Sequence, residues 1–209
     1  EAVGIDRIER REAEMTRKAF ERWGSHPGIE ILGNPDPARR VGIISFNIRD
    51  PKGQYLHPRL ITTLLNDLFG IQSRAGCSCA GPYGHQLLGI DEHKAEEYRT
   101  WITRGYHGIK PGWCRVGFHY VFDEDELEYL LKCVEFVAEQ GHRFVHRYHF
   151  DARSGGWQHK DWQPQALSFS IQEALQSDRR EALPLSDEAR SQLYRSYLEQ
   201  AVALAQQVS

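Results

Sequence analysis

Residues 71–85 hold the side chains best suited to chemistry in this 209-residue sequence. Two of the four cysteines, Cys77 and Cys79, are separated by one residue, and Arg74 precedes Cys79 by five positions. Small residues and glycines around Cys79 predict a loop on which a backbone can approach a ligand and a thiol can reach it. A thiolate is a nucleophile whose formation is helped by a nearby cation such as Arg74. Cys79 is therefore predicted to be either a nucleophile or a residue that lines a pocket.

Arg115 is the second candidate, in the segment Cys114-Arg-Val-Gly-Phe-His-Tyr120. A guanidinium offers a fork of donors that binds a carboxylate in two places. The alternative is a structural ion pair with one of the 29 acidic residues. Arg74 has two interpretations as well, because it either binds a ligand or holds the loop.

Metal-site interpretations are weaker. Cys77, Cys79, Cys114 and His85 could be grouped as a zinc cluster, but Cys-x-Cys is not the usual Cys-x2-Cys spacing. A disulfide between Cys77 and Cys79 would be strained at this spacing. The three histidines at 142, 146 and 149 follow helical steps, yet Gly141 and the aromatic alternation favour a strand or loop with solvated side chains. We expect no metal.

Composition limits the class of protein. A formal net charge of -3 gives no reason to expect a nucleic-acid or membrane-surface partner. No apolar run approaches the ~20 residues of a membrane span, and no signal peptide is visible. Four cysteines do not form a disulfide framework, which predicts a reducing cytoplasm.

Hydrophobic periodicity predicts alternating strands and helices. The expected fold class is α/β (α+β), with a small mixed or antiparallel sheet covered by helices. Residues 1–150 would form the main domain, and residues 151–209 a helical C-terminal extension packed against or tethered to it. Apolar runs and turn residues predict strands at 29–32, 41–48, 71–74 and 114–120, a loop from Ala75 onward, and helices at 3–23, 58–69, 91–103, 124–140, 168–176 and 186–206.

This order, with the loop Arg74-Ala-Gly-Cys-Ser-Cys-Ala80 and the later strand Cys114-Arg-Val116, resembles the C-terminal part of class V aminotransferase-fold enzymes. These include cysteine desulfurases and selenocysteine lyases, which use pyridoxal phosphate (PLP). The resemblance covers residues 3–140. It implies the small C-terminal domain of a fold-type I PLP enzyme, commonly a homodimer that acts on a small amino acid. Arg115 would bind the substrate carboxylate, Arg74 would assist, and Cys79 would accept sulfur.

The sequence departs from the family pattern at three places. Cys77 and Ser78 replace two histidines of the desulfurase loop, and the segment 81–113 is longer than in compact desulfurases. No lysine lies where the family places the one that forms a Schiff base with the cofactor, although His93-Lys94 and His159-Lys160 are pairs of the expected type. The chain also begins at Glu1, with its one methionine at Met15. We therefore expect a fragment that lacks the PLP-lysine domain and is inactive alone.

Two other functions remain open. One is a non-catalytic interaction or dimerisation domain that uses residues 151–209 as its surface. The other is a cofactor-free sulfur carrier with a persulfide on Cys79. The sequence does not distinguish desulfuration from lyase, transamination or epimerisation chemistry.

Overall fold

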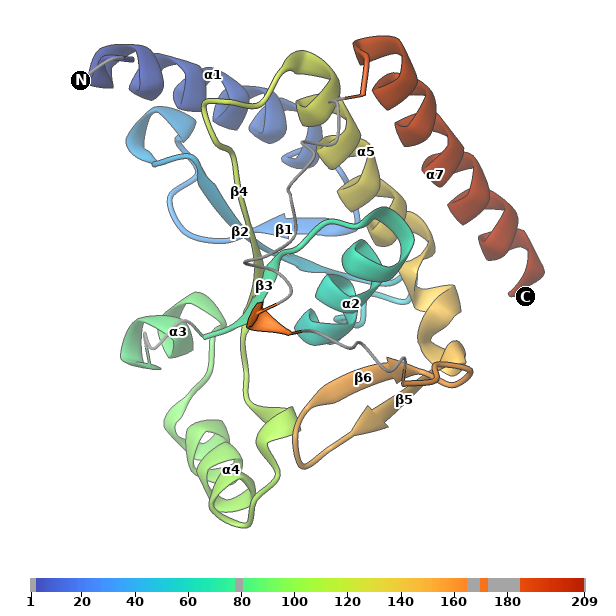
Figure 1. Cartoon of the computed structure of the whole chain (residues 1–209). Helices are drawn as coiled ribbons and strands as arrows, with labels where there is room; N and C mark the ends of the chain where they lie inside the picture. Colours follow the sequence, from blue (N-terminus) through green and yellow to red (C-terminus); the bar gives the residue numbers. More distant parts are fainter. Residues whose placement is uncertain (1–2, 78–80, 165–169, 173–184, 209) are drawn as a thin grey trace.

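The computed structural model describes residues 3–77, 81–164, 170–172 and 185–208. Its centre is a four-stranded antiparallel sheet in the order β1-β2-β4-β3 (Figure 1). The strands are β1 (Ile29–Ile31), β2 (Ile43–Ile48), β3 (Arg74–Gly76) and β4 (Trp113–Gly117). A small antiparallel sheet with helices confirms the predicted fold class.

Three helices, α1 (Ile5–Trp23), α2 (Pro58–Phe69) and α5 (Glu124–Gln140), pack on one face of this sheet. The strands alternate, so that Phe46 and its partner Cys114 point into the core while the next residues point to the opposite face. The Trp23 ring of α1 lies 5.6 Å from the Phe46 ring. The main hydrophobic core therefore fills the space between the sheet and this helix layer.

The ends of the helices follow from local sequence. Pro58 occupies the first turn of α2, and Gly70 closes the helix with a left-handed φ of 68°. At the start of α5 a capping box is present, because Asp123 accepts from the Glu126 N–H and Glu126 accepts from the Asp123 N–H. These caps fix where α2 ends before β3 and where α5 begins after β4.

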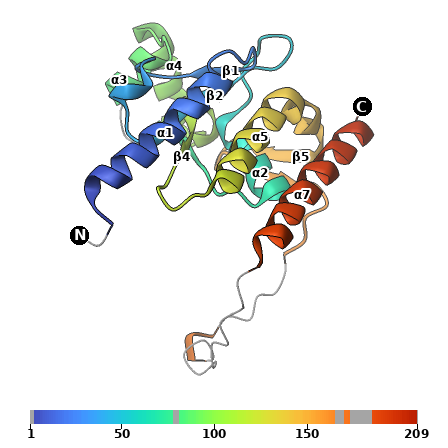
Figure 2. The same ribbon diagram turned by 90° about the horizontal axis from the view of Figure 1, so that it is seen from above.

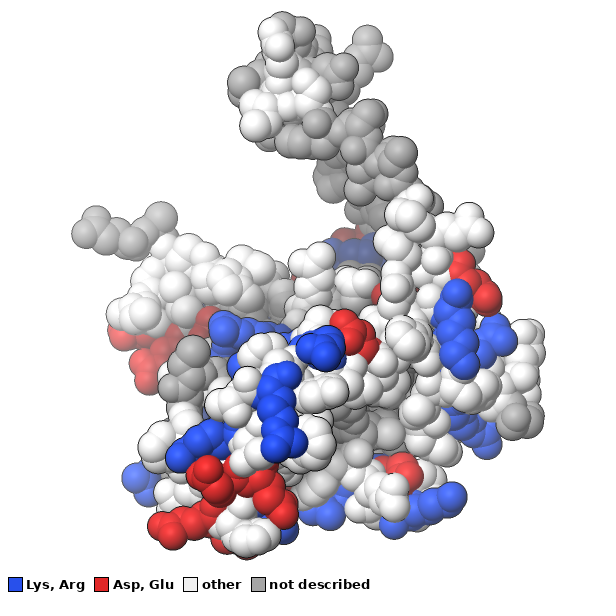
Figure 3. Space-filling view, turned by 90° about the horizontal axis from the view of Figure 1, so that it is seen from below, with Lys and Arg blue, Asp and Glu red and all other residues white. Residues whose placement is uncertain are grey.

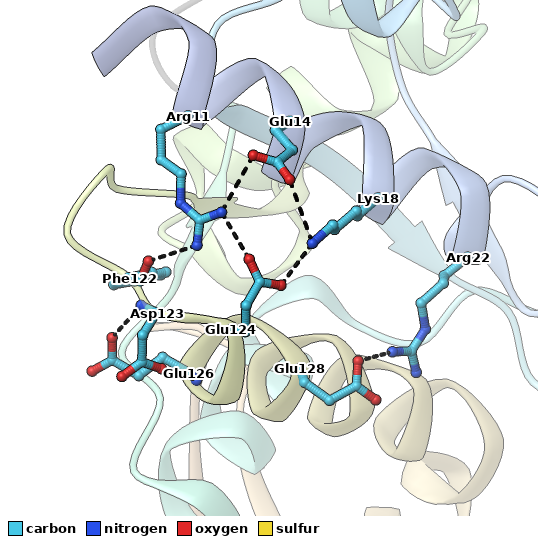
Figure 4. A network of polar contacts seen from close by, with 9 residues as sticks. All are labelled: Arg11, Glu14, Lys18, Arg22, Phe122, Asp123, Glu124, Glu126 and Glu128. Atoms are coloured by element: carbon cyan, nitrogen blue, oxygen red, sulfur yellow. Dashed lines mark hydrogen bonds and ion pairs between the residues drawn. The ribbon is translucent and has the colours of Figure 1, made fainter. Parts of the chain in front are cut away.

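A charged network joins α1 to α5 (Figure 4). Glu124 accepts from Arg11 at 2.8 Å and from Lys18 at 2.6 Å, and Arg11 also donates to the Phe122 carbonyl. Arg22 lies 2.6 Å from Glu128 and also binds Glu135. Every cation of this network therefore has a carboxylate partner.

The opposite face of the sheet is covered in part by the segment between β3 and β4. This segment contains α3 (Gly81–Leu87), α4 (Glu92–Thr103) and the short 3-10 helix η2 (His107–Ile109), which Figure 1 shows at one end of the molecule. Trp113, whose side chain points away from the main core, is only 4% exposed and lies against Gly84 of α3. The expected helix at 91–103 is confirmed, whereas α3 was not predicted.

The chain after α5 forms the 3-10 helix η3 (Gly141–Arg147) and the hairpin β5 (Tyr148–Asp151) and β6 (Gly156–His159). The last helix, α7 (Asp187–Gln207), runs beside α5 and α2 (Figure 2). The hairpin includes residues on both sides of residue 150, where the main domain was predicted to end and the C-terminal extension to begin. That division stays a prediction. Most of the helix predicted at 168–176 lies outside the described residues. The remaining 3-10 helix is η1 (Pro37–Arg39).

The strand predicted at 71–74 is wrong. Ile71 instead follows the end of α2, where its N–H donates to the Leu65 carbonyl and its side chain packs against the core. The strand begins at Arg74 and continues through Ala75 and Gly76, the residues predicted to start the loop. Small residues are required here, because a Cβ on Gly112 of the neighbouring segment would lie 2.7 Å from the Gly76 backbone.

Among the described residues, no helix combines the length and apolar character needed to cross a membrane. On the face seen in Figure 3, basic and acidic side chains are interspersed.

Candidate functional site

Arg74 and Arg115 are direct partners across the β3–β4 ladder. They share the face opposite Cys114 and Val116, which are buried in the core. Opposite residues of antiparallel strands have Cβ atoms about 4.5–5.5 Å apart. The structure thus brings together the two arginines that the sequence singled out.

Neither guanidinium has an ion pair or a side-chain hydrogen bond to any residue that the structure describes. Like charges directly opposite each other destabilise a sheet. Arg74 is exposed and Arg115 half-buried, so both retain donors for an external group. An anion held between them would supply the missing negative charge. The alternative of a structural ion pair at Arg115 therefore has no support among the described residues.

Both arginines line a groove of about 540 Å³ at the β3 edge of the sheet. The other walls come from the end of α2 and from α5 and α7, including Glu126, Tyr129 and Tyr194. The Tyr129 hydroxyl donates to the Phe69 carbonyl at 2.9 Å, and burial raises the Tyr129 pKa, which keeps the phenol neutral. The Tyr194 ring stacks on Tyr129 at 4.1 Å.

These three wall residues were not predicted as part of the site. Glu126 also takes part in the capping box of α5. Tyr194 belongs to a helix 79 positions beyond Arg115 in the sequence, and no local pattern connects the two. The contact between α5 and α7 had to be seen in three dimensions.

Cys79, the predicted nucleophile, lies outside the described residues. Cys77, which precedes that gap, is half-buried and free. Cys114 and Cys133 are buried in the core, and burial raises the pKa of Cys114 to about 12. Burial raises the Cys133 pKa as well. These two thiols stay protonated at neutral pH, which makes them core side chains and not nucleophiles.

Within the described ranges, no group of three or more His, Cys, Asp or Glu side chains could hold a metal ion. The four-residue zinc grouping stays untested, because it includes Cys79. His142 and His146 lie in η3, whereas His149 lies in β5, so the three histidines do not share one helix face.

Among the described residues, no lysine lines the groove. Lys94 lies in α4 and lines a different cavity, and Lys160 follows β6. A cofactor that forms an imine with a lysine therefore has no lysine available among the described residues of this groove.

The sequence is similar to known proteins over part of its length. The family model described as "Aminotransferase class-V" matches residues 1–130. Proteins named "Probable cysteine desulfurase" are 40% identical over 82 residues in Staphylococcus aureus and 38% identical over 104 residues in Staphylococcus epidermidis. The matches cover 39% and 50% of this chain, but only 18% and 23% of those relatives. The chain therefore spans about a fifth of their length.

Among solved structures, the apo cysteine desulfurase from Thermococcus onnurineus NA1 matches with a TM-score of 0.48 and 26% sequence identity. That match covers 66% of this chain and 27% of the other. The family match includes both arginines and all four strands of the central sheet. Because it covers more than half of the 209 residues, the chain belongs to the class V aminotransferase family.

Proposed function

We propose that this chain is the substrate-binding part of a PLP-dependent, cysteine desulfurase-like enzyme that acts on a small amino acid. The observation that carries the proposal is the pairing of Arg74 with Arg115, both unpartnered among the described residues, in one groove. A carboxylate is common to all amino-acid substrates and matches the guanidinium fork. Arg115 binds it, and Arg74 assists from the edge strand.

Enzymes of this family are PLP-dependent in general, and bound PLP supplies an electron sink for bond cleavage next to the amino group. The lining of the arginine groove fits the substrate carboxylate but contains no lysine for the cofactor. We propose that the lysine and most phosphate contacts come from protein outside these 209 residues. The chain alone is then inactive. Family likeness also supports a homodimer, and a reducing cytoplasm remains our prediction.

Cys79 is proposed as the sulfur acceptor. With cysteine as substrate, an S–S bond forms between Cys79 and the substrate sulfur while the substrate C–S bond breaks. One free thiol and one cysteine give one persulfide and one alanine, so atoms and electrons balance. In the sequence, Cys79 comes three residues after the end of β3, the strand that carries Arg74.

The test compares the complete protein with this chain after incubation with PLP and L-cysteine. We expect PLP absorbance, alanine release and a persulfide on Cys79 in the complete protein only. Cys79→Ala should abolish persulfide formation while PLP binding persists. A persulfide on the isolated chain, formed without PLP by transfer of the outer sulfur of a small-molecule persulfide to Cys79, would favour the sulfur-carrier alternative. PLP bound covalently to the isolated chain would overturn the division of labour proposed above.

A further inference from the structure

A second cavity lies on the sheet face opposite the helix layer. It has a volume of about 660 Å³ and shares no lining residue with the arginine groove. Its walls come from β1 and β2, the start of α2, and the segment between α3 and β4. The apolar part of the lining includes Leu56, Leu87, Leu88, Ile90, Ile109 and Pro111.

Asn47 is the polar group at the sheet side of this cavity. It is 4% exposed, and its register partner Glu30 also lines the cavity. No described residue makes a hydrogen bond to its carboxamide, yet its polar atoms are not sealed from solvent. The little surface that Asn47 keeps therefore opens on the cavity. A ligand with complementary groups would displace the water that reaches this amide and form hydrogen bonds with it.

Two lysines, Lys94 of α4 and Lys110 after η2, supply positive charge at the exposed rim. Neither has an ion pair among the described residues. The acidic group of the lining, Glu30, is already engaged by Arg49 at 3.1 Å and by the Tyr55 hydroxyl at 2.6 Å. The charged side chains of the lining that have no ion-pair partner among the described residues are therefore positive.

The wall that carries Lys110 is held in place by packing. The His57 ring donates from Nε2 to the Gly108 carbonyl at 2.8 Å, while Nδ1 accepts from the Arg59 N–H. The β5–β6 hairpin binds the same wall through the N–H groups of His107 and Gly108. A Cβ on Gly108 would lie 2.7 Å from the Phe150 ring. A cavity with fixed walls loses little entropy when it binds a ligand.

We propose that this cavity binds a small organic anion with an apolar body and an amide-like hydrogen-bonding group. The amide-like group pairs with Asn47, the apolar body fills the leucine- and isoleucine-lined space, and the anionic end lies at Lys94 and Lys110. The site is distinct from the arginine groove, and its occupancy does not depend on the function proposed there.

The probe is N-acetyl-L-phenylalanine, which carries all three features, and the matched neutral probe is N-acetyl-L-phenylalaninamide. Each is titrated into the labelled 209-residue chain and followed through backbone amide resonances. We expect saturable shifts at residues of the second cavity, such as Asn47, Leu88 and Gly112, with the anion bound at least fivefold more tightly than the amide.

Variants assign the contacts. Asn47→Leu should weaken both probes at least fivefold, whereas Asn66→Leu on the exposed side of α2 should change neither. A double substitution, Lys94→Gln with Lys110→Gln, should remove the preference for the anion, and Lys52→Gln should leave it intact. The lysine variants keep the test decisive if Asn47→Leu fails to fold, which thermal unfolding would reveal.

Three results would overturn the proposal. They are shifts that do not saturate, shifts confined to the arginine groove, and probe binding that is lost in the complete protein because another segment fills the cavity. Binding that survives in the complete protein and follows the variants as predicted supports it. Desulfurase activity plays no part in this test, so its failure is separable from that of the proposed function.

Discussion

Two groups of arginines in this protein have opposite surroundings. Arg11 and Arg22 on α1 are fastened to carboxylates of α5, and Arg11 also binds a backbone carbonyl (Figure 4). Arg74 and Arg115 on the sheet face each other and have no partner among the described residues. The first group uses its charge to join two helices. The second keeps its charge available, which is what a binding site for an anion requires.

The two groups of arginines are expected to contribute differently to stability and to function. Removing a paired arginine leaves carboxylates without their cation and should destabilise the fold. Removing an unpaired arginine beside another cation removes a repulsion and should leave stability almost unchanged. Function should respond in the opposite order.

The largest effect is expected for Arg115→Ala in the complete enzyme. Loss of the guanidinium contact to the substrate carboxylate should lower kcat/KM by about 100-fold, since about 1.4 kcal/mol corresponds to each factor of ten. Arg115→Lys should recover only part of the activity, because an ammonium lacks the fork. Steady-state kinetics with L-cysteine measure both. If Arg115→Ala kept wild-type kinetics, Arg115 would not differ in function from the arginines of the first group.

Arg22→Ala should show the reverse. Glu128 and Glu135 would lose their shared cation, and the Glu135 side chain is only 19% exposed. We expect a loss of about 1–2 kcal/mol in the free energy of unfolding, between the values typical of exposed and buried ion pairs. Urea unfolding of the 209-residue chain gives this value. Arg17→Ala, which removes an exposed pair with Glu21, is the matched control and should cost less than about 0.5 kcal/mol.

Tyr194→Ala tests whether α7 is a fixed wall of the arginine groove. The stacked contact with Tyr129 should contribute about 1 kcal/mol to stability. The neighbouring Leu193→Ala should cost less, because Leu193 is 36% exposed. Thermal unfolding of both variants compares them. Equal losses would mean that the stack does not hold α7 in place.

A smaller effect, on the pH dependence of stability, is expected for His57, which is hydrogen-bonded but uncharged. Burial lowers the His57 pKa from its ordinary value of 6.5, although the hydrogen bond to the Gly108 carbonyl opposes this shift. The unfolded chain then binds a proton more readily than the folded one, so His57 lowers stability as the pH falls below 6.5 toward the folded-state pKa. Relative to the wild type, His57→Gln should flatten the dependence of stability on pH in that window. Denaturant unfolding at several pH values measures the slope, and parallel slopes would refute the role of His57.

Much of the fold could be predicted because its signals are local. The helix of Pro58–Phe69 is bounded by Pro58 and Gly70, and Asp123 with Glu126 marks the start of α5. The two arginines could be found because their residue type and motif are visible in one dimension. Their register pairing could not, since it depends on where β3 begins, and Ile71 suggested a strand although it packs beside the end of α2.

Long-range packing set the other limit. In the last helix, Leu193 and Leu204 remain partly exposed, whereas Tyr194 and Leu198 pack against the core. Which side of α7 is buried depends on how it packs against α5 and α2. The periodicity of the α7 sequence does not contain that information. Likewise, the second cavity is formed by residues from 30 to 112, and none of its polar members stood out as a motif.

The most direct measurement is the affinity of the complete PLP-bound protein for an unreactive amino acid, L-alanine, followed by cofactor absorbance in three forms. We predict that Arg115→Ala raises the dissociation constant by at least about 50-fold, consistent with loss of a charge-assisted contact, while Arg22→Ala leaves it within about twofold of the wild-type value. Equal affinity in the wild type and Arg115→Ala would contradict the assignment of the unpaired arginines as the carboxylate site.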